Sequence, residues 1–276
     1  MSVGRLALEE LGIQVEKYYA SEIDKYAVKV SQANFPNIVQ VGNVCQLKSE
    51  DFKDVDLILA GSPCQGFSFA GKQLAFDDPR SALFFEFVRL LKEIKPKYFL
   101  LENVKMKQQF QDVITEQVSA CYPNLPGDLC GSQIKPISIN SALVSAQNRQ
   151  RLYWTNIPNI QQPLDKGIML QDILETEVDE NLNLMTNKGK AHCLTASYNG
   201  AVAWNSIAKR QRTMVPVVKE KPNEELKWRK LTPIECERLQ TVPDNYTNHV
   251  SNTQRYKMLG NSFTNEVIKH ILKNLI

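Results

Sequence analysis

A short apolar run at residues 56–60 is followed at once by the turn Gly61-Ser62-Pro63 and a cysteine, Cys64. The run has no helical stripe and is bounded by glycine and proline, which is typical of a buried strand in a parallel sheet. In open α/β sheets, ligands bind outside the carboxyl ends of the strands. Cys64 therefore stands where a reacting group belongs, although most cysteines in proteins are small buried hydrophobic residues.

A second apolar run, Tyr98 to Leu101, ends in Glu102-Asn103-Val104. Between the two runs, residues 83–94 carry apolar side chains at intervals of three and four, which predicts an amphipathic helix. Strand, helix, strand is the right-handed crossover unit that brings two strand ends side by side. We therefore expect the thiol of Cys64 and the carboxylate of Glu102 at the same edge of one sheet.

Two arginines precede a third predicted strand. The pattern Gln-x-Arg-x-Arg, from Gln147 to Arg151, leads directly into the apolar residues 152–157. If the chain is already extended there, Arg149 and Arg151 point to the same face and bring fixed positive charge to one cleft.

Four motifs resemble, in the same chain order, those of the cytosine-C5 methyltransferases. They are Pro63-Cys64-Gln65, Glu102-Asn103-Val104, the Gln-x-Arg-x-Arg pattern and Leu259-Gly260-Asn261-Ser262. The resemblance covers the chain except its extreme amino terminus and residues 160–228. It implies an α/β fold, a Rossmann-like class I methyltransferase sheet with helices on both faces, plus a small target-recognition domain. The implied catalytic domain is discontinuous, 1–158 and 255–276, and 159–254 form the recognition domain and its connection.

The resemblance also implies S-adenosylmethionine as cofactor and S-adenosylhomocysteine as product. Glu22 lies 18 positions beyond Gly4, near the roughly 20-residue interval between a nucleotide-binding glycine turn and the acid that binds ribose. A solvated surface charge is the alternative for a lone glutamate at a strand end. The family pattern assigns Glu22 to the ribose and Ile23 to the adenine. The remaining implied cofactor residues are Val3, Gly4, Asn43, Val44, Pro63, Asn261 and Ser262.

The amino terminus departs from the family pattern. The family opens with a strand and a Phe-x-Gly-type loop, whereas this chain begins at Met1-Ser2-Val3-Gly4-Arg5, which resembles only the tail of that loop. The strand before it would be central in the sheet, so its absence puts the full activity of this form in question. Two explanations stay open: Met1 is an internal methionine of a longer natural protein, or the gene is a decayed remnant.

The chemistry implied by the family needs a thiolate. Adding a nucleophile at C6 of cytosine turns the ring into an enamine that accepts a methyl group at C5. The resemblance makes Cys64 that nucleophile and Glu102 the partner of ring N3 and the exocyclic amine. Arg149 and Arg151 hold the carbonyl O2 and a flanking phosphate, in an order that the sequence leaves open. A stacked base is out of reach, so the cytosine is flipped out of duplex DNA.

Charge changes sign along the predicted recognition domain. Residues 165–180 carry six acidic side chains against one lysine, and residues 186–230 carry ten basic against three acidic ones. The basic stretch, with Tyr198 and Trp204 interleaved, is typical of a surface that contacts phosphates and bases. A solvated face is the alternative.

Composition sets the remaining bounds. The chain has 276 residues, 43% hydrophobic and 23% charged, with a net charge of +3. Six cysteines without regular pairing and no signal-peptide pattern predict free thiols in a reducing interior. The family resemblance implies a bacterial or phage-type cytoplasm, near the nucleoid. No apolar run reaches the roughly 18 residues that span a bilayer. The cysteine spacing predicts no metal site. We expect a monomer that binds duplex DNA, with a cognate restriction endonuclease as a further candidate partner.

Three other functions are alternatives to a cytosine-C5 DNA methyltransferase. A transfer-RNA cytosine-C5 methyltransferase shares the motifs, but the chain lacks the Cys-Phe-Thr triplet that such relatives carry. An inactive DNA-binding remnant is motivated by the amino terminus. A thiol hydrolase with a histidine base is disfavoured, because His192, His249 and His270 lie outside recognisable motifs.

Overall fold

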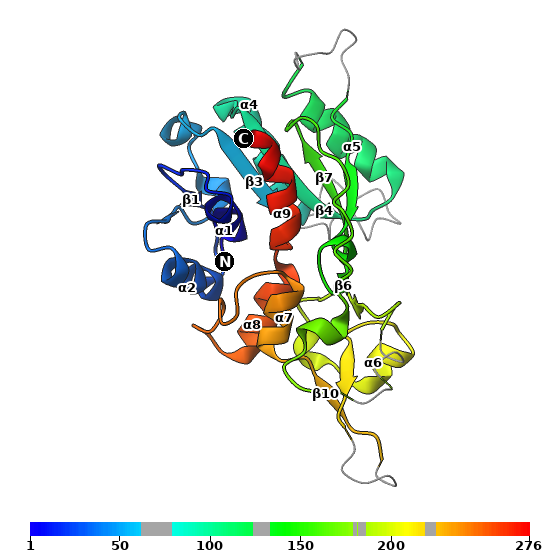
Figure 1. The fold of residues 1–276 in the computed structure, drawn as a ribbon. Helices are drawn as coiled ribbons and strands as arrows, with labels where there is room; N and C mark the ends of the chain where they lie inside the picture. Colours follow the sequence, from blue (N-terminus) through cyan, green and yellow to red (C-terminus); the bar gives the residue numbers. More distant parts are fainter. Residues whose placement is uncertain (62–78, 124–132, 179–180, 182–185, 219–224) are drawn as a thin grey trace.

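The computed structural model describes residues 1–61, 79–123, 133–178, 181, 186–218 and 225–276 (Figure 1). The upper part of the molecule in Figure 1 contains the main sheet, described below, and helices α1 (Val3–Glu10), α4 (Pro79–Ile94) and α9 (Asn265–Leu272). The lower part contains shorter elements, among them α6 (Ala203–Ile207), α7 (Pro233–Leu239), α8 (Asn252–Asn261) and β10 (Trp228–Lys230). None of the described helices is both long and apolar enough to cross a membrane. The other described α-helices are α2 (Lys25–Asn34) and α5 (Gln108–Ser119).

The main sheet has four strands in the order β3-β4-β7-β5. Strands β3 and β4 are parallel, with α4 as the crossover between them, whereas β7 runs antiparallel to both β4 and β5. The predicted strand, helix, strand unit is therefore confirmed. The strands of this sheet are β3 (Leu57–Gly61), β4 (Tyr98–Val104), β5 (Ile137–Asn140) and β7 (Gln150–Thr155).

Side chains of β4 and β7 alternate between two apolar layers, as the pleat of a sheet requires. Phe99 and Leu101 of β4 and Trp154 of β7 pack against α4 and α5. Leu100 of β4 and Tyr153 of β7 pack on the opposite face, against α1 and α9. Helices therefore cover both faces of the sheet, and the predicted Rossmann-like α/β fold is confirmed.

A second, smaller sheet carries the predicted cofactor residues. Strands β1 (Tyr19–Ala20) and β2 (Val39–Gln40) pair in parallel with each other and with no strand of the main sheet. The sequence predicts strands at about residues 15–20 and 38–41, and both observed strands are shorter. The side-chain hydroxyl of Ser21 donates to the carbonyl of Gly42 over 2.8 Å, which ties together the two chain segments that leave this sheet.

The lower part of the molecule is built from short elements around its own apolar cluster. This cluster also includes Val3 and Leu6 of α1 and Val30 of α2, so it joins the lower part to the first two helices. The predicted boundary between residues 254 and 255 lies inside α8. The strands here are β6 (Gln147–Asn148), which pairs with β8 (Ala191–His192), and β9 (Met214–Pro216), which pairs with β10 (Trp228–Lys230).

Helix α7 begins as its sequence predicts. Thr232 is the N-cap, Pro233 takes the first helical position, and Glu235 completes a capping box with Thr232. Glu235 is also fully buried and forms an ion pair with Arg229 over 2.7 Å. The start of α7 is therefore fixed from both sides, which anchors β10 next to it.

Gly260, near the end of α8, marks a close approach between distant parts of the chain. A Cβ atom at this position would overlap the backbone of Thr195 and Ala196. Only a glycine leaves room for that crossing, so the segment that follows β8 lies directly on the backbone of α8.

We expect Gly260→Ala to lower the free energy of unfolding by about 1–3 kcal/mol, the usual cost of overpacking. This cost should exceed the gain of about 1 kcal/mol in helix propensity that alanine has over glycine. Urea denaturation measures the difference. Gly200→Ala is the control, since its Cβ would lie an ordinary 3.5 Å from the flexible side chain of Arg212. A Gly260→Ala protein as stable as the control would contradict the close approach.

Candidate active site

Glu102 lies in β4 on the face of the sheet that α9 covers. The alternation of β4 places it on the side of Leu100, and only 7% of the residue is exposed. Gly61, its partner in β3, has no side chain, and a Cβ there would lie 3.7 Å from Oε2 of Glu102 and 3.2 Å from the ring of Phe263. Gly61 therefore leaves room for both the carboxylate and the ring.

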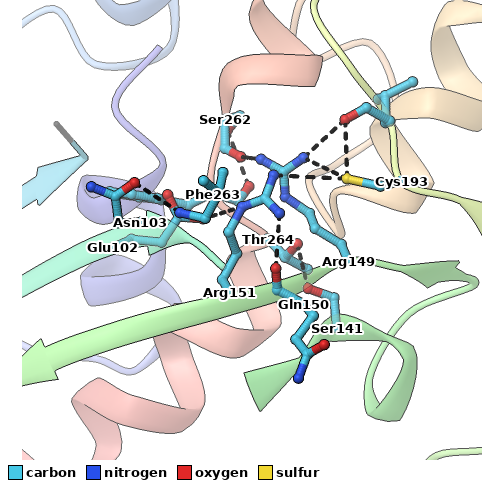
Figure 2. Close-up of polar contacts among 12 residues, drawn as sticks. Glu102, Asn103, Ser141, Arg149, Gln150, Arg151, Cys193, Ser262, Phe263 and Thr264 are labelled. Carbon is cyan, nitrogen blue, oxygen red and sulfur yellow. Dashed lines mark hydrogen bonds and ion pairs between the residues drawn. The ribbon is translucent and has the colours of Figure 1, made fainter. Parts of the chain in front are cut away.

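Arg151 of β7 pairs with this carboxylate. Its Nε lies 3.2 Å from Oε1 of Glu102, and both side chains are largely buried (Figure 2). The contact is an ion pair, and no described residue forms a hydrogen bond to Oε1. Such a buried, unbonded oxygen has the capacity to take a hydrogen bond from a ligand or to carry a proton.

The electrostatics of Glu102 favour its protonated form. Burial raises the pKa of this carboxyl above its ordinary value, and the positive charges of Arg149 and Arg151 oppose that rise without cancelling it. For Arg151, burial lowers the pKa of the guanidinium, but Glu102 and Cys193 outweigh burial and raise it. The site therefore combines a permanent positive charge with a carboxyl group that is able to hold a proton.

Arg149 lies between β6 and β7 and is 2% exposed. Its guanidinium donates to the carbonyl of Leu194 over 2.9 Å, to that of Gly260 over 3.2 Å and to that of Ser262 over 2.7 Å. Two segments that are distant in the chain, one at Leu194 and one at residues 260–262, therefore meet on the side chain of Arg149. Of the two predicted arginines, Arg151 is the one paired with Glu102, and Arg149 is occupied by backbone carbonyls.

Two of the predicted site residues, Cys64 and Pro63, lie outside the described residues. The strand that leads to them, β3, ends at Gly61, directly opposite Glu102 in the parallel register.

Glu22 and Ile23 follow β1, at the end of the smaller sheet. Oε1 of Glu22 accepts hydrogen bonds of 2.8 Å from the backbone N–H groups of Ile23 and Asp24. This fixes the carboxylate and leaves Oε2 without a partner in those contacts. Ile23 is 78% exposed, so its side chain is open to contact with a ligand.

Asn43 follows β2, in a segment tied to the one that leaves β1, and its side-chain oxygen accepts from the N–H of Cys45 over 3.1 Å. Val44 begins the short 3-10 helix Val44–Gln46. A fixed carboxylate, an exposed aliphatic side chain and an amide at neighbouring strand ends match the hydroxyls, the ring face and the amine of a nucleoside. The chemistry of these residues therefore fits the adenosyl part of S-adenosylmethionine.

Of the other predicted cofactor residues, Val3, Gly4 and Ser262 lie in packed positions. The side chain of Val3 is 4% exposed within an apolar cluster, and Gly4 contacts Leu59 of β3. Asn261, the last residue of α8, is exposed, whereas Ser262 is buried and accepts from Arg149 through its carbonyl. A contact of any of these four with a cofactor stays a prediction.

Sequence reasoning missed Cys193, because the sequence shows only that Cys193-Leu194-Thr195-Ala196 resembles a turn often seen in the family's recognition domain. The structure places its sulfur beside both arginines, 3.5 Å from Nη1 of Arg149 and 3.7 Å from Nη2 of Arg151 (Figure 2). Six cysteines in the sequence gave no means to choose this one. The only signal in the sequence for such a contact was the charge of Arg149 and Arg151, because a buried charge needs a polar partner.

The chain is similar to known proteins over nearly its whole length. The profile of the family described as C-5 cytosine-specific DNA methylase matches residues 3–165 and 164–276. The Type II methyltransferase M.NlaX of Neisseria lactamica is 32% identical over 98% of this chain and 92% of its own length. M1.ScrFI of Lactococcus lactis subsp. cremoris, also named a Type II methyltransferase, is 31% identical over 95% of this chain and 72% of its own.

Among solved structures, the Entamoeba histolytica methyltransferase EhMeth has the same fold, with a TM-score of 0.71 at 20% identity over 99% of this chain and 94% of that one. The family match extends over both the sheet that holds Glu102 and the segment that holds Cys193. This chain belongs to the C-5 cytosine-specific DNA methylase family.

Proposed function

We propose that the chain is a DNA (cytosine-5-)-methyltransferase, which transfers a methyl group from S-adenosylmethionine to C5 of a cytosine flipped out of duplex DNA. The observation that carries this proposal is the pair of Glu102 and Arg151. It offers a buried carboxyl with a raised pKa and one unbonded oxygen, opposite the end of the strand that leads to Cys64.

Each of these side chains has a defined task in the proposed reaction. The thiolate of Cys64 adds to C6 of the cytosine, which places electron density at C5 and on ring N3. After C5 has taken the methyl group, loss of the C5 proton and elimination of the Cys64 thiolate from C6 restore the aromatic ring and the free enzyme. Glu102, whose pKa is raised by burial, gives N3 a proton or a hydrogen bond and accepts from the exocyclic amine. Arg151 stands next to Glu102 and binds O2 of the base, while Arg149 secures the backbone around it.

The proposed cofactor contacts lie at the ends of β1 and β2. Glu22 binds the ribose hydroxyls, Ile23 packs on the adenine, and Asn43 accepts from the adenine amine. S-adenosylmethionine, when bound, supplies the electrophilic methyl group. Val3, Gly4, Val44, Pro63, Asn261 and Ser262 complete the proposed cofactor set.

Residues 159–254 are proposed to bind the DNA, with 1–158 and 255–276 as the catalytic domain. Support comes from the ten basic residues at positions 186–230 and from Trp204, which is 66% exposed. An exposed tryptophan among basic side chains suits stacking and phosphate contact together. The Type II names of the relatives favour duplex DNA as substrate and a restriction endonuclease as the cellular counterpart. We propose a monomer in a bacterial cytoplasm.

Cys64→Ser is expected to abolish methylation, because a serine hydroxyl is scarcely ionised near neutral pH and adds poorly to C6. DNA binding should stay measurable, since the recognition surface is unchanged. Incorporation of a radioactive methyl group into duplex DNA measures the first quantity, and a gel-shift titration measures the second. Substantial methyl transfer by this variant would remove Cys64 from the role of nucleophile.

Glu102→Gln keeps the size of the side chain but removes its proton-holding carboxyl. We expect turnover to fall by about 100-fold or more, the usual contribution of a general acid or base, with little change in affinity for S-adenosylmethionine. Steady-state kinetics and calorimetry report the two quantities separately. Glu116→Gln, at an exposed position of α5, is the control. An equal loss of turnover and cofactor affinity in Glu102→Gln would contradict the assignment.

The substrate class is tested by bisulfite sequencing of DNA from cells that express the chain, together with competition between duplex DNA and transfer RNA in vitro. We expect 5-methylcytosine at one short recurring DNA sequence, and inhibition by duplex DNA but not by transfer RNA. Methylation of transfer RNA alone, or of neither nucleic acid, would overturn the proposed function.

A further inference from the structure

The thiol of Cys193 joins the two arginines of the candidate site. Its Sγ accepts from Nη1 of Arg149 over 3.5 Å and from Nη2 of Arg151 over 3.7 Å, and donates to the carbonyl of Leu194 over 3.5 Å (Figure 2). The residue is half-buried and follows β8, far along the chain from both arginines. One sulfur atom therefore links the segment after β8 to β7.

The side chain of Arg151 has few contacts within the sheet that would hold it in one conformation. Its long side chain has about 2 kcal/mol of rotamer entropy to lose before it holds one geometry. Among the described residues of the sheet, Arg151 makes polar contacts only with the carboxylate of Glu102, at 3.2 Å, and with the neighbouring carbonyl of Gln150, at 2.9 Å. Cys193 is the contact that comes from outside the sheet.

The sulfur itself is held in a fixed place. The next residue, Leu194, donates its N–H to Oε1 of the buried Gln147 over 3.1 Å and accepts from Arg149 over 2.9 Å through its carbonyl. Thr195 then crosses directly over Gly260. Because the backbone is fixed on both sides of the thiol, Cys193 is able to hold a flexible arginine without moving itself.

The segment that carries Cys193 is also tied to the basic surface. The N–H of His192 donates to the hydroxyl of Thr213 over 2.8 Å, and Arg212 donates to the hydroxyl of Ser197 over 2.9 Å. Residues on both sides of Cys193 are therefore bonded to the stretch that bears the arginines of the proposed DNA surface.

We propose that Cys193 is a positioning residue of this enzyme, whose sulfur holds the guanidinium of Arg151 against Glu102. The role rests on the proposed function, in which Arg151 binds the target base. In this role, the segment after β8 takes a direct part in aligning Glu102 and Arg151. The same segment also contacts the basic stretch.

Kinetics of Cys193→Ala and Cys193→Ser test the role. The alanine variant should lose about tenfold in kcat, the effect of one lost hydrogen bond to a charged group, with KM for DNA and affinity for S-adenosylmethionine within about twofold. Serine keeps a polar atom with a shorter reach and should recover part of the loss. Cys121→Ala is the matched control, because that half-buried thiol also bonds a carbonyl, of Gln117, but lies on α5's carboxyl end.

A second readout does not depend on activity. Among the described residues, the charged or titrating groups that face Glu102 are Arg149, Arg151 and Tyr153. Because Arg151 lowers the pKa of Glu102, a less firmly held arginine should let that pKa rise further in Cys193→Ala. Titration of the free protein with ¹³C-labelled glutamate, assigned with Glu102→Gln, measures this shift by NMR.

An unchanged Glu102 titration, or a kcat for Cys193→Ala within twofold of wild type, would overturn the role of Cys193. A loss of activity that only parallels a fall in melting temperature would overturn it as well. If the wild-type chain methylates no nucleic acid, the proposed function fails, but the NMR titration still decides whether Cys193 positions Arg151.

Discussion

The burial of Glu102 beside Arg151 is the interaction on which the rest of the site depends. A carboxylate alone at this depth would be costly to desolvate, and an arginine alone would be costlier still. Together they fix each other, yet the pair is imperfect, because one oxygen of Glu102 is left without a hydrogen bond. Because that oxygen has the capacity to accept a further hydrogen bond, a base with its own donors and acceptors is able to bind at this ion pair.

Much of the fold could be predicted from the sequence, because its periodicities are strong and local. The apolar runs and the helical stripe between them gave β3, α4 and β4 in the right order, and Thr232, Pro233 and Glu235 gave the start of α7. Strands β1 and β2 were predicted too long, because an apolar sequence marks where a strand is possible but not where its hydrogen-bonded partner ends.

The candidate site was only partly predictable. Glu102 and Arg151 were found from their motifs, but the sequence could not say which arginine pairs with the carboxyl. Arg149 binds three carbonyls from segments far apart in the chain, and Cys193 meets both guanidiniums, and these contacts exist only once the chain has folded. Long-range polar contacts of this kind have no period, so a single sequence carries no signal for them.

The crossing of Thr195 over Gly260 has a consequence for exchange of parts between relatives. A foreign module grafted between β7 and α8 must bring a backbone that follows the same path over this glycine, whatever ligand it binds. Chimeras should therefore tolerate wide sequence change in the module and almost none in the route of this one loop. The glycine and the loop are best regarded as a matched pair that is inherited, or transplanted, together.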